Sequence, residues 1–251
     1  MKVFFVGGGP GDPDLLTLKG ERLLRRCRIC IYAGSLLSPQ IVGLISPATE
    51  KYDSAGMSLR EIVAVFRDAQ ARDIDVVRLH SGDPAIYSAI GEQMEELDRL
   101  GIDYEVIPGI SAFQASAAAL RKELTAPEIS QTIILTRISG RTPIPREQEL
   151  EKLAQTRSTL CIFLSGDRME EVANRLVPYY GKDCPAAVVY HASWPNQKVL
   201  RGELGEIAAK AKEGEFGRTS MILVGWALSR NLPSSMLYDA KFGHTFRRGK
   251  S

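Results

Sequence analysis

The chain has 251 residues, which is enough for one large domain or two of ordinary size. Its 32 basic and 30 acidic residues nearly cancel, and 44% of its residues are hydrophobic. This composition argues against a disordered protein and against one drawn by its overall charge to nucleic acid or membrane. No apolar run approaches the ~20 residues needed to span a bilayer. Because residues 2–6 already form an apolar strand pattern, we expect no signal peptide and a cytoplasmic protein.

The cysteines do not indicate a disulfide framework or a metal centre. Cys27 and Cys30 form a C-x-x-C, but no second such pair follows, and Cys161 and Cys184 lie far away in the sequence. A zinc site or a redox pair is therefore the less favoured alternative, and reduced thiols in the core fit better. The histidines lack the spacing of metal ligands, so we expect no metal site.

The first half of the sequence alternates between strand and helix patterns. Ser58 and Glu61 have the spacing of a capping box and predict that a helix begins there. The other expected helices cover residues 17–26, with Thr17 as the cap, 86–100 and 111–120. The expected strands cover residues 3–6, 28–33, 75–80 and 104–107. Such alternation predicts a mostly parallel sheet with helices on both faces.

A break at residues 122–130 contains Pro127 and has no clear periodicity. We place a domain boundary there, between residues 1–125 and 126–251. The second half then predicts strands at 132–137, 159–164, 186–190, 198–201 and 220–224, and helices after the Gly/Pro-rich loop at 140–145, at 169–176 and at 204–211. The expected fold class is α/β, with two α/β/α domains, mostly parallel sheets and the active-site cleft between the domains.

Glycine, proline and other small residues gather directly after the predicted strands. These clusters lie at residues 7–13, 81–84, 108–112, 165–167 and 191–195. In a parallel sheet the carboxyl ends of the strands share one edge, where open α/β folds bind ligands. Glycines there let the backbone approach a ligand and present its N–H groups. The clusters therefore predict a ligand-binding cleft.

The first cluster does not fit a dinucleotide site. The pattern G-x-G-x-x-G would use Gly7 and Gly9 but requires a third glycine where the sequence has Asp12. A ribose-binding acid is also missing, because the second strand ends in Tyr32-Ala33-Gly34-Ser35. The P-loop pattern is absent. The loops suit a ligand that is held by backbone groups and carries little charge.

Three of these segments together resemble the signatures of the tetrapyrrole methylases. They are residues 6–13 with 16–20, residues 78–84 and residues 108–112. A finer resemblance points to the members of that family that act on C11 of precorrin-4. It is carried by residues 32–36, 53–58, 123–128, 136–143, 192–195 and 242–247.

The resemblance implies two α/β domains that bind S-adenosylmethionine in a folded pose, release S-adenosylhomocysteine, and form a homodimer without nucleic-acid or membrane partners. Carried over position by position, it places the cofactor contacts at Pro10, Gly82, Asp83, Ile86, Ser111, Ala112, Leu164, Ser165, Ala192 and Thr219. Taken alone, each of these residues also has an ordinary structural explanation, as a turn former, a core residue or a helix cap.

The sequence departs from part of the family at one position. Relatives that methylate uroporphyrinogen carry an Asp after the Tyr that ends the second strand, whereas this chain has Ala33 after Tyr32. We therefore name no catalytic acid or base. The implied tetrapyrrole substrate carries acetate and propionate groups, which require basic partners. The candidates, each of which could equally be plain surface charge, are Arg121, Lys122, Arg137 and Arg141.

Two alternatives stay open at this point. One is another tetrapyrrole methylase, acting at C17 or C20, on uroporphyrinogen, or on a modified histidine of a translation factor. The other is a nucleotide-binding oxidoreductase or a regulatory module with a doubly wound fold. The missing third glycine and the missing ribose acid argue against the second alternative.

Overall fold

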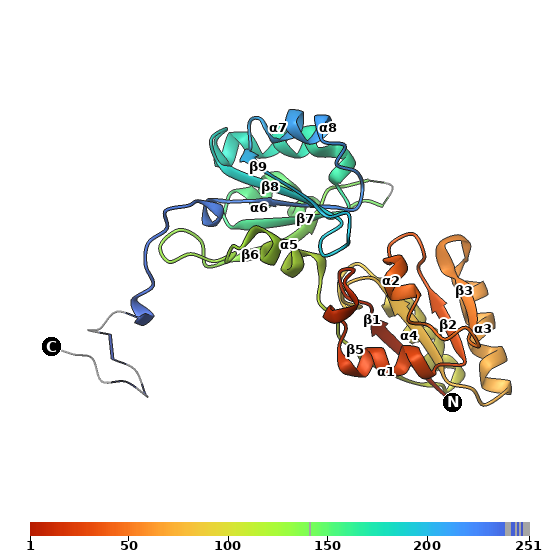
Figure 1. Cartoon of the computed structure of the whole chain (residues 1–251). Coiled ribbons are helices and arrows are strands. Elements are labelled where there is room, and N and C mark those ends of the chain that lie inside the picture. Colours follow the sequence, from red (N-terminus) through yellow and green to blue (C-terminus); the bar gives the residue numbers. More distant parts are fainter. Residues whose placement is uncertain (141, 239–241, 244, 246, 248–251) are drawn as a thin grey trace. The chain divides into compact units, whose positions relative to one another are not determined.

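The computed structural model describes residues 1–140, 142–238, 242–243, 245 and 247 (Figure 1). The chain forms two compact units. The first contains Met1–Ser116 and His191–Gln197, and the second contains Ala117–Tyr190 and the chain from Lys198 onward. The first unit thus includes a short segment that lies far along the sequence. The domain boundary that we expect between residues 125 and 126 stays a prediction.

The first unit is built on a parallel sheet. Its strands are β1 (Lys2–Gly7), β2 (Ile29–Tyr32), β3 (Glu50–Asp53), β4 (Val76–His80) and β5 (Asp103–Ile107). They are arranged in the order β3-β2-β4-β1-β5, and each neighbouring pair is parallel. The central strands are apolar and buried, as expected for a sheet covered on both faces. All the strands therefore end at the same edge.

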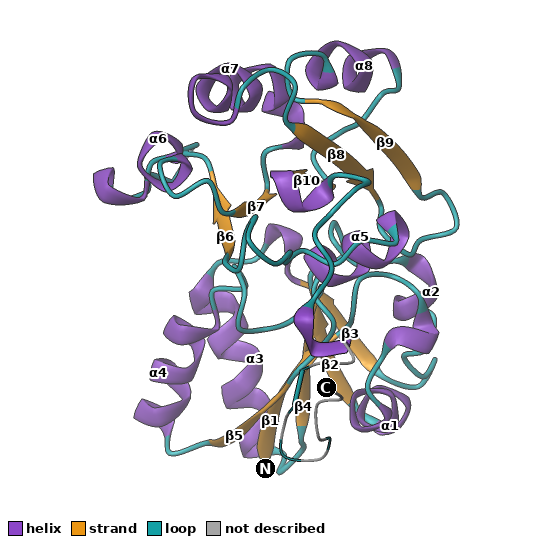
Figure 2. Cartoon of the chain, turned by 90° about the vertical axis from the view of Figure 1, so that its left-hand side faces the viewer, coloured by secondary structure: helices purple, strands orange, loops and turns teal. Residues whose placement is uncertain are grey.

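Helices cover both faces of this sheet. They are α1 (Leu18–Arg26), α2 (Pro39–Val42), α3 (Leu59–Ala71) and α4 (Ile90–Leu100), and the chain leaves the unit within α5 (Ala112–Leu120). Phe66 of α3 and Leu97 of α4 share one apolar core, whereas Leu24 of α1 and Ile41 of α2 share the core on the other face (Figure 2). The predicted caps are confirmed, since Thr17 caps α1 and Ser58 forms a capping box at α3.

The second unit contains a sheet with strands in both directions. Its strands are β6 (Ile133–Arg137), β7 (Thr159–Phe163), β8 (Pro185–Tyr190), β9 (Lys198–Glu203) and β10 (Ser220–Val224). In the order β6-β7-β10-β8-β9, strands β6, β7 and β8 run one way, and β9 and β10 run the other. Because β10 is antiparallel, its first residue, Ser220, lies opposite Tyr190 at the end of β8.

One face of this second sheet packs against α6 (Leu150–Ala154), α7 (Met169–Tyr180) and α8 (Ile207–Glu213), and the shared core includes Leu160 and Val188. The residues that point to the other face of the strands, such as Cys161 and Leu223, are also buried. Short 3-10 turns complete the described chain at Pro13–Leu15, Ser54–Gly56, Arg146–Gln148, Gly166–Arg168, Trp226–Leu228 and Met236–Tyr238.

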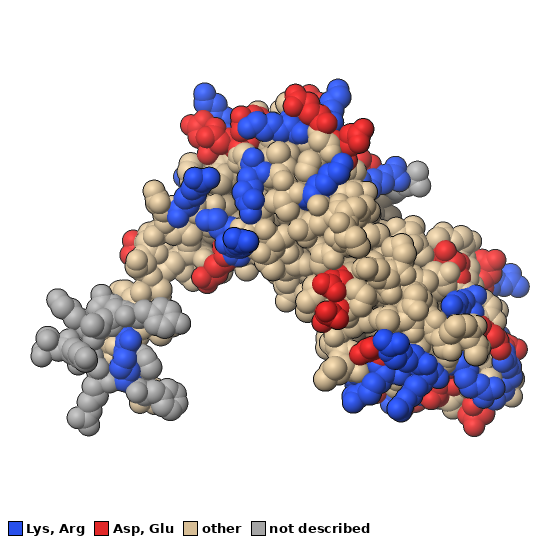
Figure 3. All heavy atoms as spheres, in the orientation of Figure 1, with Lys and Arg blue, Asp and Glu red and all other residues tan. Residues whose placement is uncertain are grey.

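The α/β fold class is confirmed. The expected parallel arrangement holds for every neighbouring pair of the first sheet, whereas in the second sheet β6 and β7 are parallel and the other three neighbouring pairs are antiparallel. The other differences concern short elements. Strand β3 and helix α2 were not predicted, and α4 begins at Ile90 instead of residue 86. Cys30, Cys161 and Cys184 are buried thiols, as expected for core cysteines. Within the described ranges, no helix is both long and apolar enough to cross a bilayer. Acidic and basic side chains are interspersed over the face drawn in Figure 3, in keeping with the small net charge of +2.

Candidate functional site

Three strand-end loops of the first unit meet backbone to backbone at glycines. A Cβ atom built at Gly7 would lie 2.6 Å from the nitrogen of Gly109 and 2.8 Å from the carbonyl oxygen of Gly82. A Cβ atom at Gly109 would lie 2.2 Å from that same oxygen. Gly82 also exchanges backbone hydrogen bonds of 2.8 and 3.2 Å with Gly9. We call these residues, Gly7, Gly82 and Gly109, the glycine junction.

The carboxylate of Asp83 ties two of these loops together. One oxygen accepts a 2.9 Å hydrogen bond from the N–H of Gly109, and the other accepts a 2.8 Å bond from the N–H of Ala85. These bonds fix the loop after β4 to the loop after β5. Asp83, expected from the sequence as a cofactor contact, therefore has a clear role in shaping the loops.

Gly82 packs against the start of α5. Its φ of +63° lies in the left-handed region that favours glycine. A Cβ atom there would reach the Cα atom of Ser111 at 3.7 Å and the nitrogen of Ala112 at 3.9 Å, which are ordinary contacts. The cradle formed by these residues carries no bulky side chain. That a ligand binds to the backbone here stays a prediction.

The loop that leads from the glycine junction into α4 has an unusual backbone. Tyr87 and Ala89 have φ angles of 53° and 49°, which non-glycine residues rarely adopt. Ala89 precedes α4 without any side-chain cap, so the helix starts later than its apolar pattern predicts. Ile86, a candidate contact, lies half-buried in this loop. Such backbone strain gathers at functional sites in proteins.

A fourth segment, residues 191–197, is bonded to the glycine-rich loop after β1. The indole N–H of Trp194 donates a 2.7 Å hydrogen bond to the carbonyl oxygen of Pro10, and the N–H of Asp12 donates a 3.0 Å bond to the hydroxyl of Ser193. Two sequence-predicted residues, Pro10 and the buried Ala192, thus belong to segments that are bonded to each other within one unit.

The remaining cofactor candidates lie in the second unit. They follow the carboxyl end of β7 or precede the amino end of β10, which lies beside the carboxyl end of β8. Leu164 is 57% exposed and has a φ of 53°, an unusual combination for a large apolar residue. The hydroxyl of Ser165 is occupied, because it donates to Phe163 and accepts from the N–H of Ile138. Ser165 is also fully buried, so in this structure neither its hydroxyl nor its backbone is exposed to a ligand. Thr219 is half-buried in the turn before β10.

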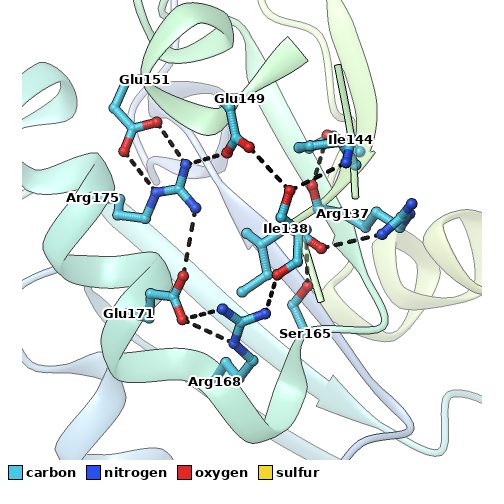
Figure 4. Close-up of polar contacts among 11 residues, drawn as sticks. Arg137, Ile138, Ile144, Glu149, Glu151, Ser165, Arg168, Glu171 and Arg175 are labelled. Carbon is cyan, nitrogen blue, oxygen red and sulfur yellow. Dashed lines mark hydrogen bonds and ion pairs between the residues drawn. The ribbon is translucent and has the colours of Figure 1, made fainter. Parts of the chain in front are cut away.

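The guanidinium of Arg137 forms several hydrogen bonds within the second unit, and Figure 4 shows the 3.4 Å bond that it donates to the carbonyl oxygen of Ile138. Its guanidinium donates to the carbonyl oxygens of Thr142 at 2.9 Å and Pro143 at 3.0 Å, which pins the loop after β6. Arg121 is exposed, and the ammonium group of Lys122 donates to the carbonyl oxygen of Ser229. Arg141 lies outside the described residues.

The loop after β6 is also anchored by a network of charged side chains, which we did not predict from the sequence. Arg175, whose side chain is 20% exposed, pairs with Glu149 at 2.5 Å, Glu151 at 2.6 Å and Glu171 at 3.5 Å (Figure 4). Arg168 joins Glu171 and donates to the carbonyl oxygen of Ser139. The hydrogen bonds from Arg175 hold the pKa values of Glu149 and Glu151 below their usual range. Glu171 has helical spacing from both Arg168 and Arg175. The pairs of Arg175 with Glu149 and Glu151 depend on tertiary packing, so sequence spacing gives no signal for them.

Two basic side chains of β4, the strand that leads into the loop of Gly82, are buried. Arg78 donates from Nε to the side-chain oxygen of Gln93 at 3.0 Å, and burial lowers its pKa to about 10. His80 is 4% exposed, and no described residue pairs with its Nε2 atom. Burial, with a smaller effect from Arg78, lowers the pKa of His80 to about 3. His80 is therefore neutral at physiological pH.

This buried histidine predicts a loss of stability in mild acid. The pKa of His80 is about 3 in the folded state and 6.5 when unperturbed, so the unfolded chain binds more protons between these values. The free energy of unfolding should fall by up to ~1.4 kcal/mol per pH unit below pH 6.5. Urea unfolding at pH 7 and pH 5 measures it, with His80→Leu as the comparison. Equal losses in the two proteins would rule out His80 as the cause.

The chain is thus an α/β protein of two units, in which loops rich in glycine and other small residues follow the parallel strands. The sequence matches the family of tetrapyrrole (corrin/porphyrin) methylases over residues 2–208, and the chain belongs to this family. A relative from Pseudomonas aeruginosa, a precorrin-4 C(11)-methyltransferase, is 47% identical over 251 residues, which is 100% of both chains.

Solved structures agree with this assignment. The X-ray structure of a cobalamin biosynthetic enzyme, cobalt precorrin-4 methyltransferase, has a TM-score of 0.88 at 41% identity and covers 91% of this chain and 96% of its own. A uroporphyrin-III C-methyl transferase from Thermus thermophilus, solved in complex with S-adenosyl homocysteine, has a TM-score of 0.75 at 28% identity. The match covers 91% of this chain and 93% of that one.

Proposed function

We propose that this protein transfers a methyl group from S-adenosylmethionine to C11 of precorrin-4 or its cobalt form. The observation that carries the proposal is the full-length similarity to a precorrin-4 C(11)-methyltransferase. The likeness to the cobalt precorrin-4 methyltransferase structure supports it. Both substrate forms are kept, because the two relatives are named for different ones. As part of the same proposal, the protein is a cytoplasmic homodimer, and light scattering would give its oligomeric state.

The loops of the first unit supply the main cofactor contacts in this proposal. Gly82, which packs against Ser111 and Ala112, would present its backbone to the ligand together with these two residues. Pro10 and Ala192 add contacts from the two bonded segments. The cofactor, when bound, supplies a methyl group carried on a positively charged sulfur. The proposed contacts in the second unit are made by Leu164, Thr219 and Ser165, of which Ser165 is buried in this structure.

We assign no catalytic acid or base. A reduced tetrapyrrole carries electron-rich ring carbons that act as nucleophiles themselves, and Ala33 stands where some relatives carry an acid. The protein then contributes mainly by orienting the two reactants, which is worth several kcal/mol in favourable cases. The loops fixed by Asp83 and the glycine junction provide the rigidity that such orientation requires. Exclusion of water from the site would limit side reactions.

Thermal melts with ligands test the cofactor proposal. S-adenosylhomocysteine should raise the melting temperature, because a ligand at a hundredfold excess over its Kd stabilises the native state by about 2.7 kcal/mol. NAD is the control and should have no effect. Gly82→Val should abolish the shift, since a β-branched residue is strained at a φ of +63°. A shift with NAD and none with S-adenosylhomocysteine would overturn the proposal.

Substrate affinity should depend on basic residues in the second unit. Arg137→Ala removes a guanidinium and the bonds that hold the loop at Thr142 and Pro143. We expect tetrapyrrole binding to weaken by about 1.5–3 kcal/mol, whereas binding of S-adenosylhomocysteine stays unchanged. Fluorescence titration measures both. Arg99→Ala, which removes the same charge from the exposed surface of α4, is the control. Normal tetrapyrrole binding by Arg137→Ala would show that this residue is not part of the substrate site.

A further inference from the structure

We propose that Trp194 is a positioning residue that holds the glycine-rich loop after β1 in its cofactor-binding conformation. The inference rests on the proposed function, because it assigns a role in that same site. Trp194 acts through the loop: the loop binds the ligand, and the indole fixes the loop. We call residues 191–197, which contain this indole, the latch.

The latch holds the peptide groups on both sides of Gly11. The indole N–H of Trp194 donates to the carbonyl oxygen of Pro10 at 2.7 Å. On the other side, the N–H of Asp12 donates to the hydroxyl of Ser193 at 3.0 Å. Between these bonds the indole lies directly on the backbone, since a Cβ atom at Gly11 would be 2.1 Å from Cδ1 of Trp194. Gly11 is thus required for the close approach of the indole.

The latch is itself held in shape by its own bonds. The rings of His191 and Trp194 are stacked, with centroids 4.1 Å apart and an interplanar angle of 21°. Nδ1 of His191 lies 3.0 Å from the side-chain oxygen of Asn196, and the N–H of Ser193 donates to Gln197 at 2.7 Å. His191 and Ser193 have φ angles of 48° and 68°, which non-glycine residues rarely adopt. Such a backbone persists only where its surroundings fix it, so the indole is presented in one orientation.

A loop rich in glycine needs such a restraint in order to bind a ligand tightly. Glycine loses more conformational freedom on ordering than any other residue, and residues 7–9 and 11 are all glycine. A loop that must be ordered by its ligand binds more weakly than one already held in the bound conformation. The latch holds the loop in the bound conformation before the ligand arrives. Removing its bonds should therefore weaken cofactor binding, even in a protein that remains folded.

Two variants remove the polar bonds of the latch one at a time. Trp194→Phe keeps an aromatic ring to stack on His191 but loses the bond to Pro10. Ser193→Ala loses the bond to Asp12 and keeps the indole. Each should weaken S-adenosylhomocysteine binding about 3- to 10-fold, as expected for one hydrogen bond. In turnover, KM for S-adenosylmethionine should rise by a similar factor, whereas kcat at saturating cofactor stays close to the wild-type value.

The matched control is Trp226→Phe, which replaces a 39% exposed tryptophan of the second unit. The chain has two tryptophans, so this control leaves Trp194 as its sole indole. Addition of S-adenosylhomocysteine should change the fluorescence of Trp194 in this variant, whereas the indole of Trp226 in Trp194→Phe should show no change at saturation. A residue that only stabilises the fold would lower the melting temperature without these effects.

Titration of the wild-type protein separates the two claims. If the wild type fails to bind S-adenosylhomocysteine, the proposed function is overturned, and this inference with it. If the wild type binds and both latch variants bind equally well, the latch inference alone is overturned and the function stands. Weaker binding by the folded latch variants, together with normal binding by Trp226→Phe, supports it.

Discussion

Gly109→Ala is expected to destabilise the protein by about 3 kcal/mol, at the upper end of what overpacking costs. The new Cβ atom would lie 2.2 Å from the carbonyl oxygen of Gly82 and 2.9 Å from the Cα atom of Gly7. Both neighbours are backbone atoms near strand ends, so they cannot turn aside as a flexible side chain does. Separating the loops should also abolish binding of S-adenosylhomocysteine. Urea unfolding and ligand titration measure the two effects.

The control for this substitution is Gly91→Ala in α4. A Cβ atom at Gly91 would meet nothing within 4 Å, and alanine is a better helix former than glycine. This variant should be more stable by about 0.5–1 kcal/mol and bind the ligand normally. If Gly109→Ala behaved like Gly91→Ala, the close packing of the glycine junction would not be a requirement of the fold.

Asp83→Ala is expected to weaken S-adenosylhomocysteine binding by roughly 100-fold. The substitution removes both hydrogen bonds of the carboxylate, to the N–H groups of Gly109 and Ala85. Hydrogen bonds to a charged group contribute about 1.5–3 kcal/mol each, and a loss of roughly 3 kcal/mol corresponds to such a factor. Calorimetric titration of the folded variant measures the affinity.

Asp83→Asn distinguishes loop shaping from charge. Its amide keeps one acceptor oxygen and can preserve one of the two bonds, so its affinity should lie between those of the wild type and Asp83→Ala. If Asp83→Asn binds as weakly as Asp83→Ala, the negative charge matters more than the bonds. Wild-type affinity in Asp83→Ala would contradict the role assigned to this carboxylate.

Much of the fold is predictable because its elements are long or strongly patterned. Strand β4 is rich in aliphatic residues, and α3 begins at a capping box, so both are visible in the sequence. Strand β3 is not, because its residues Glu50–Asp53 are polar and lie at the edge of the sheet. Helix α2 has four residues, too few for a helical pattern to show. The late start of α4 reflects the left-handed residues Tyr87 and Ala89, which apolar spacing does not reveal.

One part of the candidate site was predictable, because parallel strands end at one edge of their sheet. That rule brings the loops after β1, β4 and β5 together, and they do meet at the glycine junction. It does not predict the latch, because the bond from Trp194 to Pro10 joins residues 184 positions apart. It also misses how Gly7 and Gly109 are used, since their close packing against each other is a tertiary feature. The occupied side chains of Ser165 and Arg137 are invisible in the sequence for the same reason.

The position of methyl transfer tests the account most directly. The protein is incubated with precorrin-4, and separately with its cobalt form, in the presence of S-adenosylmethionine that carries a carbon-13 methyl group. Carbon-13 NMR of the product then locates the new methyl group. The account predicts a methyl signal at C11 with at least one of the two substrates. A signal at C17 or C20, or turnover of uroporphyrinogen alone, would contradict it while leaving the chain in its family.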